Sequence, residues 1–376
     1  MRIAHFLVGH CNPDSANGVE KTVYHLSKHQ AALGHTVVLF SLTDKSAVPI
    51  PGVEIKTYLP AWFIFMLPKA LFTDLLAWQP DIVHLHSAYV PWNAHLSRWL
   101  QRKRIAYVST PHGGLSPYVL RRRWYLKRPY RLFFELPIQN HAAFVHALSA
   151  AEAAHIKRYG VHSAIAIAPN GIDIDALCPE PRKEYLKSLY PQIEGKRIFL
   201  FLGRLDPTSK GLDLLLRGIK AAQAKDSVLI LVGPDSKGKR RELAELAQEL
   251  HIDSQVIFSD PVYGTDKFDL LAGADVFIHT SRSEGLPFSV LEAAASKLPC
   301  LLTPVADPNG LLGQHQAAII VEPDPASIAA GIQQFMTIDN SALRAMGERA
   351  YQVVKDKFNW QHIARTVTDA YQKYAG

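Results

Sequence analysis

Residues 275–293, DVFIHTSRSEGLPFSVLEA, are the most informative stretch of the chain. The apolar start, residues 275–280, is typical of a buried parallel strand. Gly285 then interrupts the pattern, Pro287 suits the first turn of a helix, and residues 289–295 are good helix formers. We therefore predict a strand, a short acidic loop and a helix in this order.

Two carboxylates, Glu284 and Glu292, flank the start of this predicted helix. The free backbone N–H groups and partial positive charge of a helix N-terminus suit a phosphate. Carboxylates do not bind phosphate, but they accept hydrogen bonds from the vicinal hydroxyls of a ribose or a hexose. The combination predicts a site for a nucleotide-sugar.

Strand and helix patterns alternate along nearly the whole chain, which predicts parallel sheets covered on both faces. Prolines are frequent from Pro169 to Pro191, and we place a domain linker there. We expect an α/β protein with two similar domains and a ligand cleft at the carboxyl ends of their strands. The expected strands are residues 3–8, 36–40, 82–85, 106–110, 144–148, 197–202, 228–232, 256–258, 276–280 and 300–302.

The composition is that of a globular protein with room for two domains, since 376 residues include 48% hydrophobic and 20% charged residues. The apolar run at the N-terminus is too short for a signal peptide, and the longest apolar cluster, residues 61–67, is too short to span a membrane. Three widely spaced cysteines argue against a disulfide framework or a cysteine metal site. These features favour a cytoplasmic protein.

The net charge of +7 is unevenly distributed, because no acidic residue occurs between residues 82 and 134. Aromatic residues, including Trp124 and Tyr125, lie among the basic ones. A solvated basic face, an anionic membrane surface and a nucleic acid are the alternatives. Basic and aromatic residues together suit a membrane interface, and no nucleic-acid fold signature is present. The candidate membrane contacts are Arg121, Arg122, Arg123, Lys127 and Arg128.

A second phosphate signal follows the strand predicted over residues 197–202. Gly203 ends this strand, Arg204 lies in the loop, and Lys210 precedes the next helix. Two cations at the carboxyl edge of a sheet can clamp a diphosphate. A basic loop of this kind is also common on surfaces, but its place in the same domain as the two glutamates favours a phosphate site.

The first half of the chain carries weaker signals. Gly18, which follows Asn17, permits a close backbone approach to a ligand, but the loop lacks the G-x-G-x-x-G pattern of dinucleotide sites. His112 follows a strand at the ligand-facing edge of the predicted sheet, which favours a functional role. His84 and His86 share one face of a strand, and the sequence identifies no third metal ligand for them.

Together these motifs resemble family 4 of the retaining glycosyltransferases, which have the GT-B fold of two Rossmann-like domains with parallel sheets facing a central cleft. The resemblance covers nearly the whole chain. One departure is Asn17, where the family commonly has a second glycine, and we expect its side chain to reach the donor sugar. The matching residues are Asn17-Gly18-Val19-Glu20, Pro111-His112-Gly113, Pro169-Asn170-Gly171-Ile172-Asp173, Gly203-Arg204, Lys210-Gly211, Glu284 to Glu292, and Trp360.

The resemblance implies a role for each matching position. Arg204 and Lys210 would hold the diphosphate and stabilise the leaving group, and His112 would bond the donor sugar near the reacting carbon. Glu284 would contact hydroxyls of the transferred sugar, and Glu292 those of the ribose. The other donor contacts would come from Gly18, Gly203, the backbone of Gly285, Leu286 and Phe288, the adjoining Pro287, and Val262 beside the base.

The resemblance also implies that residues 1–170, completed by a C-terminal helix over residues 360–376, form the acceptor-side domain. Residues 171–359 would form the nucleotide-sugar domain. The expected activity is retaining, metal-independent hexosyl transfer, without a cofactor, from a nucleoside diphosphate sugar to a lipid-linked or polysaccharide acceptor in cell-envelope glycan synthesis. Uridine is favoured over guanine as the donor base. The alternatives are a catalytically silent nucleotide-sugar-binding subunit, or an epimerase or phosphorylase on the same fold.

Overall fold

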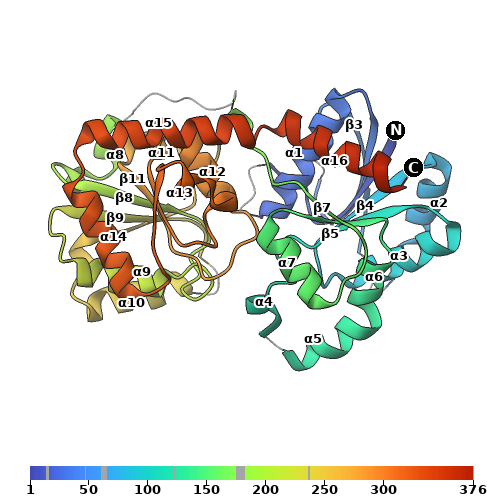
Figure 1. Cartoon of the computed structure of the whole chain (residues 1–376), viewed down its shortest axis with the longest axis horizontal. Coiled ribbons are helices and arrows are strands. Elements are labelled where there is room, and N and C mark those ends of the chain that lie inside the picture. Colours follow the sequence, from blue (N-terminus) through green and yellow to red (C-terminus); the bar gives the residue numbers. More distant parts are fainter. Residues whose placement is uncertain are drawn as a thin grey trace. The chain divides into compact units, whose positions relative to one another are not determined.

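The computed structural model describes residues 1–13, 17–46, 48–60, 66–121, 124–174, 183–235 and 238–375. The chain forms two compact units, one of residues 1–171 with 360–376 and the other of residues 172–359. Each unit contains one sheet with helices on both of its faces (Figure 1). The predicted α/β class with two Rossmann-like domains is confirmed.

The first unit has a seven-stranded sheet with the order β3-β2-β1-β4-β5-β6-β7, and neighbouring strands are parallel. Its strands are β1 (Arg2–Val8), β2 (Thr36–Leu42), β3 (Val53–Tyr58), β4 (Ile82–His86), β5 (Tyr107–Thr110), β6 (Phe144–Ala147) and β7 (Ile165–Ile167). Its helices are α1 (Gly18–Ala32), α2 (Lys69–Trp78), α3 (Pro91–Lys103), α4 (Pro117–Arg121), α5 (Trp124–Tyr130), the π-helix η1 (Arg131–Glu135), α6 (Leu136–Asn140), α7 (Ala150–Tyr159) and α16 (Trp360–Ala375).

The last helix of the chain returns to the first unit. α16 packs against α1 (Figure 1), where the Trp360 ring stacks on His25 with centroids 5.6 Å apart. Gly171 lies directly beside Trp360, and a Cβ at Gly171 would come within 2.6 Å of the indole. A larger residue at this position would therefore displace the helix.

The second unit has a six-stranded parallel sheet with the order β10-β9-β8-β11-β12-β13. Its strands are β8 (Arg197–Leu202), β9 (Ser227–Val232), β10 (Val256–Ser259), β11 (Val276–His279), β12 (Cys300–Leu302) and β13 (Ala318–Ile320). Its α-helices are α8 (Lys183–Leu189), α9 (Leu212–Ala222), α10 (Lys239–Glu249), α11 (Gly264–Gly273), α12 (Phe288–Ala295), α13 (Leu311–Gln314), α14 (Pro325–Thr337) and α15 (Asn340–Lys357), and its short 3-10 turns are η3 (Pro191–Ile193), η4 (Asp253–Gln255) and η5 (Pro308–Gly310).

The central strands of both sheets are buried on both faces, as their apolar sequences predict. In β8, for example, Phe199 and Phe201 point to the same face and are fully buried. Strand and helix alternation therefore places loops with polar residues at the carboxyl ends of β8 and β11, next to each other in the sheet. Among the described residues, none of the helices combines the length and apolar character that crossing a bilayer requires.

Candidate functional site

A cluster of polar side chains surrounds Glu284 at the carboxyl end of β11. Its Oε1 accepts hydrogen bonds from the Nζ of Lys210 at 2.6 Å, the Nε2 of His279 at 2.9 Å and the Oγ of Ser281 at 2.6 Å. The side chains of Lys210 and Glu284 are only 16% and 11% exposed. The predicted pair of site residues is thus in direct contact, and His279 and Ser281 complete a cluster that the sequence analysis missed.

The surroundings of Glu284 favour its ionised form. Burial alone would raise the pKa of Glu284, but the Lys210 ammonium and the His279 hydrogen bond lower it well below its usual range. Burial lowers the pKa of His279 despite its contact with Glu284. At neutral pH, Glu284 is therefore an anion held by a neutral histidine donor and a cation.

Contacts between two loops hold Lys210 in place. Arg282 in the loop after β11 makes a two-pronged ion pair with Asp213 in α9, both N···O distances being 2.7 Å. Gly211 has φ +65°, and a Cβ there would lie 2.1 Å from the carbonyl oxygen of Thr280. The residue that follows Lys210 must therefore be glycine for the loops to approach this closely.

The second carboxylate, Glu292, lies in α12 and is largely buried. Its Oε1 accepts from the Nζ of Lys267 at 2.9 Å, and the two side chains are 9% and 14% exposed. α12 begins at Phe288, so Pro287 is its N-cap residue; the prediction that Pro287 belongs to the first turn was wrong. Pro287 has an extended ψ of 116°, so the helix begins one residue later than the sequence suggested.

The other predicted donor contacts of the second unit differ in exposure, since Gly203 and Gly285 are half-buried whereas Leu286 and Pro287 are buried. The backbone N–H groups of Gly285 and Leu286 find no acceptor in the part of the chain that the structure describes. Arg204, after Gly203 at the end of β8, is exposed and makes no ion pair with any described residue. Val262 is half-buried in the loop after β10. The Arg204 guanidinium and the Gly285 amide can therefore meet an anionic ligand without breaking a bond to another described residue.

In the first unit, Asn17 caps the helix that begins at Gly18. Its Oδ1 accepts from the N–H of Val19 at 3.1 Å, and its Nδ2 donates to Oε1 of Glu20 at 3.3 Å. The extended φ of −90° at Asn17 is that of an ordinary N-cap. The departure from a glycine pair therefore has a local structural role in addition to the predicted contact with a ligand.

His112 adopts a left-handed backbone conformation, with φ +52°, at the carboxyl end of β5. Its Nε2 lies 3.1 Å from the Nδ1 of His86. The next residue, Gly113, donates its N–H to Oε1 of Glu152 at 2.5 Å, and Leu148 donates to Oε2 of the same carboxylate at 2.7 Å. Glu152, which the sequence analysis did not identify, therefore fixes the loop that presents His112.

The structure supplies the third histidine that the sequence analysis could not find. His5 of β1 joins His84 and His86, and ring nitrogens of the three lie within 4.8 Å of one another. The parallel register that pairs His5 with His84 brings them together. The distances match a possible metal site, but both nitrogens of each ring already contact protein partners at 2.6–3.1 Å.

Two sequence-family models match the chain. Glycosyltransferase Family 4 matches residues 16–176, and Glycosyl transferases group 1 matches residues 186–353. The chain belongs to the group 1 and family 4 glycosyltransferases. The chain is accordingly a glycosyltransferase of the GT-B fold, as the resemblance of its motifs implied.

Solved structures share this fold, and curated proteins are similar in sequence. A sucrose-phosphate synthase from Thermosynechococcus elongatus superimposes with a TM-score of 0.82 at 21% identity, covering 99% of this chain and 98% of that one. Anabaena HepE in complex with UDP-glucose gives a TM-score of 0.79 at 17% identity, covering 99% and 100%. A GDP-mannose-dependent alpha-mannosyltransferase of Mycobacterium tuberculosis is 24% identical over 91% of each chain.

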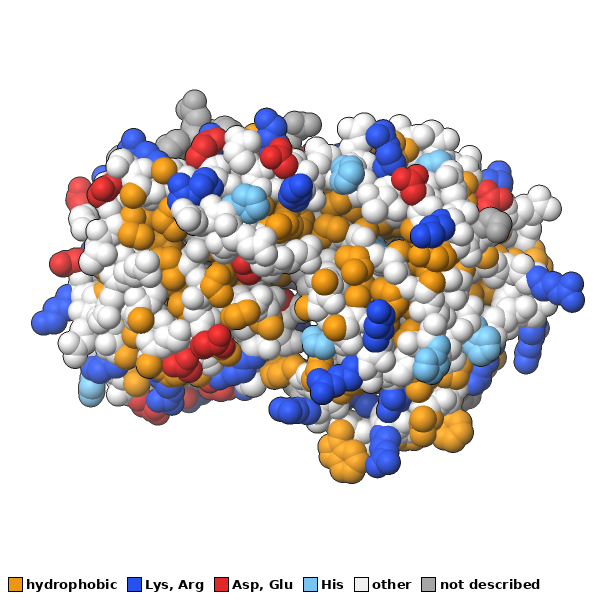
Figure 2. Space-filling model, in the orientation of Figure 1, with side chains coloured by type: hydrophobic (Ala, Val, Ile, Leu, Met, Phe, Trp, Pro, Cys, Tyr) orange, Lys and Arg blue, Asp and Glu red, His pale blue; other side chains and the backbone are white. Residues whose placement is uncertain are grey.

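The basic and aromatic patch of this glycosyltransferase lies on α4, α5 and η1. Trp124 and Tyr125 are each 61% exposed, and Phe133 is 66% exposed. Apolar and basic side chains adjoin one another over α5 in Figure 2. Arg121 and Arg128 are exposed, whereas Lys127 is half-buried and donates to the carbonyl of Val119. Arg122 and Arg123 lie outside the described residues.

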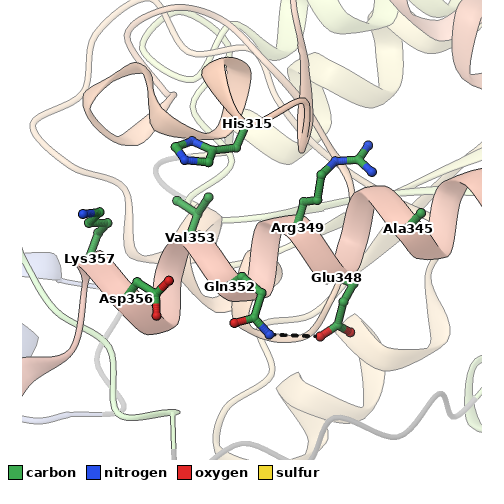
Figure 3. Close-up of a pocket in the computed structure, with 8 residues that line it drawn as sticks. All are labelled: His315, Ala345, Glu348, Arg349, Gln352, Val353, Asp356 and Lys357. Atoms are coloured by element: carbon green, nitrogen blue, oxygen red, sulfur yellow. Dashed lines mark hydrogen bonds between the residues drawn. The ribbon is translucent and has the colours of Figure 1, made fainter.

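A groove of about 370 Å³ lies on α15 of the second unit (Figure 3), and none of the residues that line it is a predicted site residue. Val353 forms part of its floor, and Gln352 donates to Glu348 at 3.3 Å along the helix. Arg349 donates a hydrogen bond to the carbonyl oxygen of Gln316 at 2.7 Å. None of the residues clustered around Glu284 lines this groove, so the groove does not contribute to the candidate site.

Proposed function

We propose that this glycosyltransferase moves a hexosyl group from a nucleoside diphosphate sugar, preferably a uridine one, to a lipid-linked or polysaccharide acceptor. One observation carries the proposal: the Glu284 carboxylate, bonded to Lys210, is followed in the loop before α12 by the amides of Gly285 and Leu286, which find no acceptor among the described residues. The site therefore offers a hydroxyl acceptor, a cation and a phosphate-binding helix end together.

Each group has a distinct task in the proposed complex. Lys210 and Arg204 bind the diphosphate, and the amides of Gly285 and Leu286 donate hydrogen bonds to a phosphate oxygen. Glu284 accepts from hydroxyls of the transferred sugar, and Glu292 accepts from the ribose. Because Lys210 already neutralises Glu284, donor binding redistributes an existing ion pair and leaves no buried charge unpaired.

The proposed chemistry is mainly electrostatic. Departure of the nucleoside diphosphate builds negative charge, and preplaced cations with a helix N-terminus stabilise it without a metal. We propose retention by front-face substitution, in which the acceptor oxygen bonds to the anomeric carbon while its proton passes to the departing phosphate oxygen. Mass spectrometry after reaction with a slow fluorinated donor tests this step, since a sugar covalently bound to the protein would contradict it.

The donor base needs a direct test, because the similar proteins differ in it. One solved relative binds UDP-glucose, and one curated relative uses GDP-mannose. Isothermal titration with UDP, GDP and ADP discriminates among the bases. We expect one nucleotide to bind at least tenfold more tightly than the others and Glu292→Gln to weaken it about tenfold, because a hydrogen bond to a charged group contributes about 1.5–3 kcal/mol.

The contrary outcomes of this titration are also defined. No binding of any nucleotide would sink the assignment of the site. Tight binding without turnover of any donor and acceptor would favour a silent nucleotide-sugar-binding subunit. A matched control is Glu245→Gln, since Glu245 forms only an exposed ion pair with Arg241 on α10. Its nucleotide affinity should equal that of the unaltered protein.

We further propose that the patch on α4, α5 and η1 docks on an anionic membrane where the acceptor resides. Its exposed aromatic residues can enter the interface while Arg121 and Arg128 attract acidic lipids. At about 1 kcal/mol per basic residue, reversing both charges should weaken vesicle binding at least about thirtyfold.

Vesicle flotation with phosphatidylserine tests the docking. The double variant Arg121→Glu and Arg128→Glu should stay in solution, and Trp124→Ala should bind more weakly. The matched control is Arg217→Glu with Lys220→Glu, two exposed charges on α9. Equal binding of the patch and control variants would exclude this surface as the docking site.

A further inference from the structure

A continuous chain of hydrogen bonds crosses the core of the first unit and ends at His112. It connects strands β1, β4, β5 and β6 with helices α1 and α16 and the segment after β7. Apart from His112, all of its members are at most 2% exposed. In order they are Ala168, His146, Thr110, His84, Tyr371, Gln30, His5, His86 and His112.

The first half of the chain is polarised by a backbone carbonyl. The oxygen of Ala168 can only accept, so Nε2 of His146, 2.7 Å away, donates to it. The Nδ1 of a neutral His146 then accepts from the hydroxyl of Thr110 at 2.9 Å. Because that hydroxyl proton is used, the Thr110 oxygen accepts from Nε2 of His84 at 2.6 Å.

Tyr371 and Gln30 continue the same direction of donation from His84 to His5. The Nδ1 of His84 accepts from the Tyr371 hydroxyl at 2.6 Å, and the Tyr371 oxygen accepts from Nε2 of Gln30 at 3.3 Å. This fixes the orientation of the Gln30 amide, whose Oε1 faces Nε2 of His5 at 2.7 Å. His5 therefore carries its proton on Nε2 and presents a lone pair on Nδ1.

The last two bonds set the tautomer of His112. Nδ1 of His5 accepts from Nε2 of His86 at 3.0 Å, and Nδ1 of His86 accepts from Nε2 of His112 at 3.1 Å. His112 is thus protonated on Nε2, and its Nδ1 keeps a lone pair. Among the described residues, none forms a hydrogen bond with that Nδ1.

We propose that this buried chain is a positioning device that holds His112 as the Nε2–H tautomer and presents its Nδ1 as an acceptor for a hydroxyl of the transferred sugar. The role of Nδ1 as an acceptor for the sugar rests on the proposed function, whereas the tautomer of His112 does not. Tyr371, Thr110 and Gln30 are positioning residues, because they touch His112 only through other members of the chain.

The polarity depends on neutral rings, and the surroundings keep them neutral. Burial lowers the pKa of His5 and of His146 to about 4, and it lowers those of His84 and His86 well below the ordinary value. A reversed chain would set the lone pair of His146 against the Ala168 carbonyl. The loss of one buried hydrogen bond disfavours the reversed polarity by at least about tenfold.

A metal ion held by His5, His84 and His86 is the competing interpretation of the same residues. Each ring would have to offer one nitrogen lone pair to the metal. That nitrogen would then give up its hydrogen bond to Gln30, Thr110, Tyr371 or a neighbouring histidine. Each of these partners would then lose a buried hydrogen bond. The observed pattern, in which every ring nitrogen of the three has a protein partner, fits the polarised chain instead.

Long-range ¹H–¹⁵N correlation spectra of the whole protein test the proposal, because they distinguish protonated from unprotonated ring nitrogens. The signals of His112, one of 17 histidines, are assigned by their absence in His112→Asn. The unaltered protein without donor should show a single Nε2–H tautomer. Tyr371→Phe should populate the Nδ1–H form to tens of per cent, because Gln30 is then free to turn over.

Two further variants complete the test. Thr110→Val cuts the chain at a different bond and should also release the second tautomer. Tyr107→Phe is the matched control, since buried Tyr107 bonds the carbonyl of Ile138 at 2.8 Å outside the chain. It should lose similar stability and leave the His112 spectrum unchanged.

Three results would overturn the proposal. One is an Nδ1–H form of His112 in the unaltered protein. Another is a spectrum that changes no more in Tyr371→Phe and Thr110→Val than it does in Tyr107→Phe. The third is one equivalent of a tightly bound metal that His84→Ala removes. A correct tautomer in a protein that binds no donor would refute the proposed function while leaving the chain intact.

Discussion

Replacing Lys210 by methionine should impair stability and catalysis by separate amounts. The ammonium lies 2.6 Å from Glu284, and both side chains are mostly buried. Removing one partner of a buried ion pair costs about 3–5 kcal/mol. Glu284 keeps its bonds from His279 and Ser281, and the pair is not fully enclosed, so we expect a loss of about 2–3 kcal/mol in the free energy of unfolding.

The catalytic loss should be larger than the loss of stability alone would produce. Removing one donor that stabilises transition-state charge lowers kcat about a hundred- to a thousandfold. Urea unfolding gives the first quantity, and the rate of nucleoside diphosphate release gives the second. The rate is measured well below the unfolding midpoint, so that the folded population stays constant.

A double-mutant cycle separates the two effects. Combining Lys210→Met with Glu284→Gln removes the unpaired charge, so the double variant should recover about 1–2 kcal/mol of stability relative to the sum of the single variants. It should recover no activity. Lys239→Met, which breaks the exposed pair with Glu242, is the control and should change stability by less than about 0.5 kcal/mol. A kcat for Lys210→Met within twofold of the original would refute the role of this cluster.

Two further predictions concern stability. Burial raises the pKa of Glu135 to about 7. The protonated carboxyl therefore contributes its full share to the free energy of unfolding below the unfolded pKa near 4.5, and this share is lost as pH rises through 7. Glu135→Gln should therefore gain about 3 kcal/mol relative to the original protein between pH 4.5 and 8 in urea unfolding, and a pH-independent difference would contradict this. Gly211→Ala should lose at least about 2 kcal/mol and most activity, because its Cβ would meet the Thr280 carbonyl, whereas exposed Gly195→Ala, with open space at its Cβ, should lose only the strain of φ +74°.

The sequence was most informative where one segment contains the whole signal. Residues 275–293 predict a strand, a loop and a helix from local patterns alone, and the structure has β11 and α12 there. The contact between Lys210 and Glu284 spans 74 residues, so no local pattern could predict it. It follows from the adjacency of β8 and β11, which only the strand order of the sheet provides.

The histidine chain shows why the remainder could not be predicted. The alternation of His84 and His86 indicated a shared face, but the third ring depends on the register between β1 and β4. Tyr371 comes from a helix 287 residues from His84. Even the family resemblance, which implied the C-terminal helix, contains no information about which way each hydrogen bond points.

We propose above all that the residues around Glu284 and Glu292 bind and activate a nucleoside diphosphate sugar. The most direct measurement is release of nucleoside diphosphate from a panel of UDP-, GDP- and ADP-sugars, with Glu292→Ala in parallel. We expect slow turnover of one donor, and a rate at least about tenfold lower in the variant, which remains folded. Turnover that is unchanged in Glu292→Ala, or no binding of any donor, would contradict it.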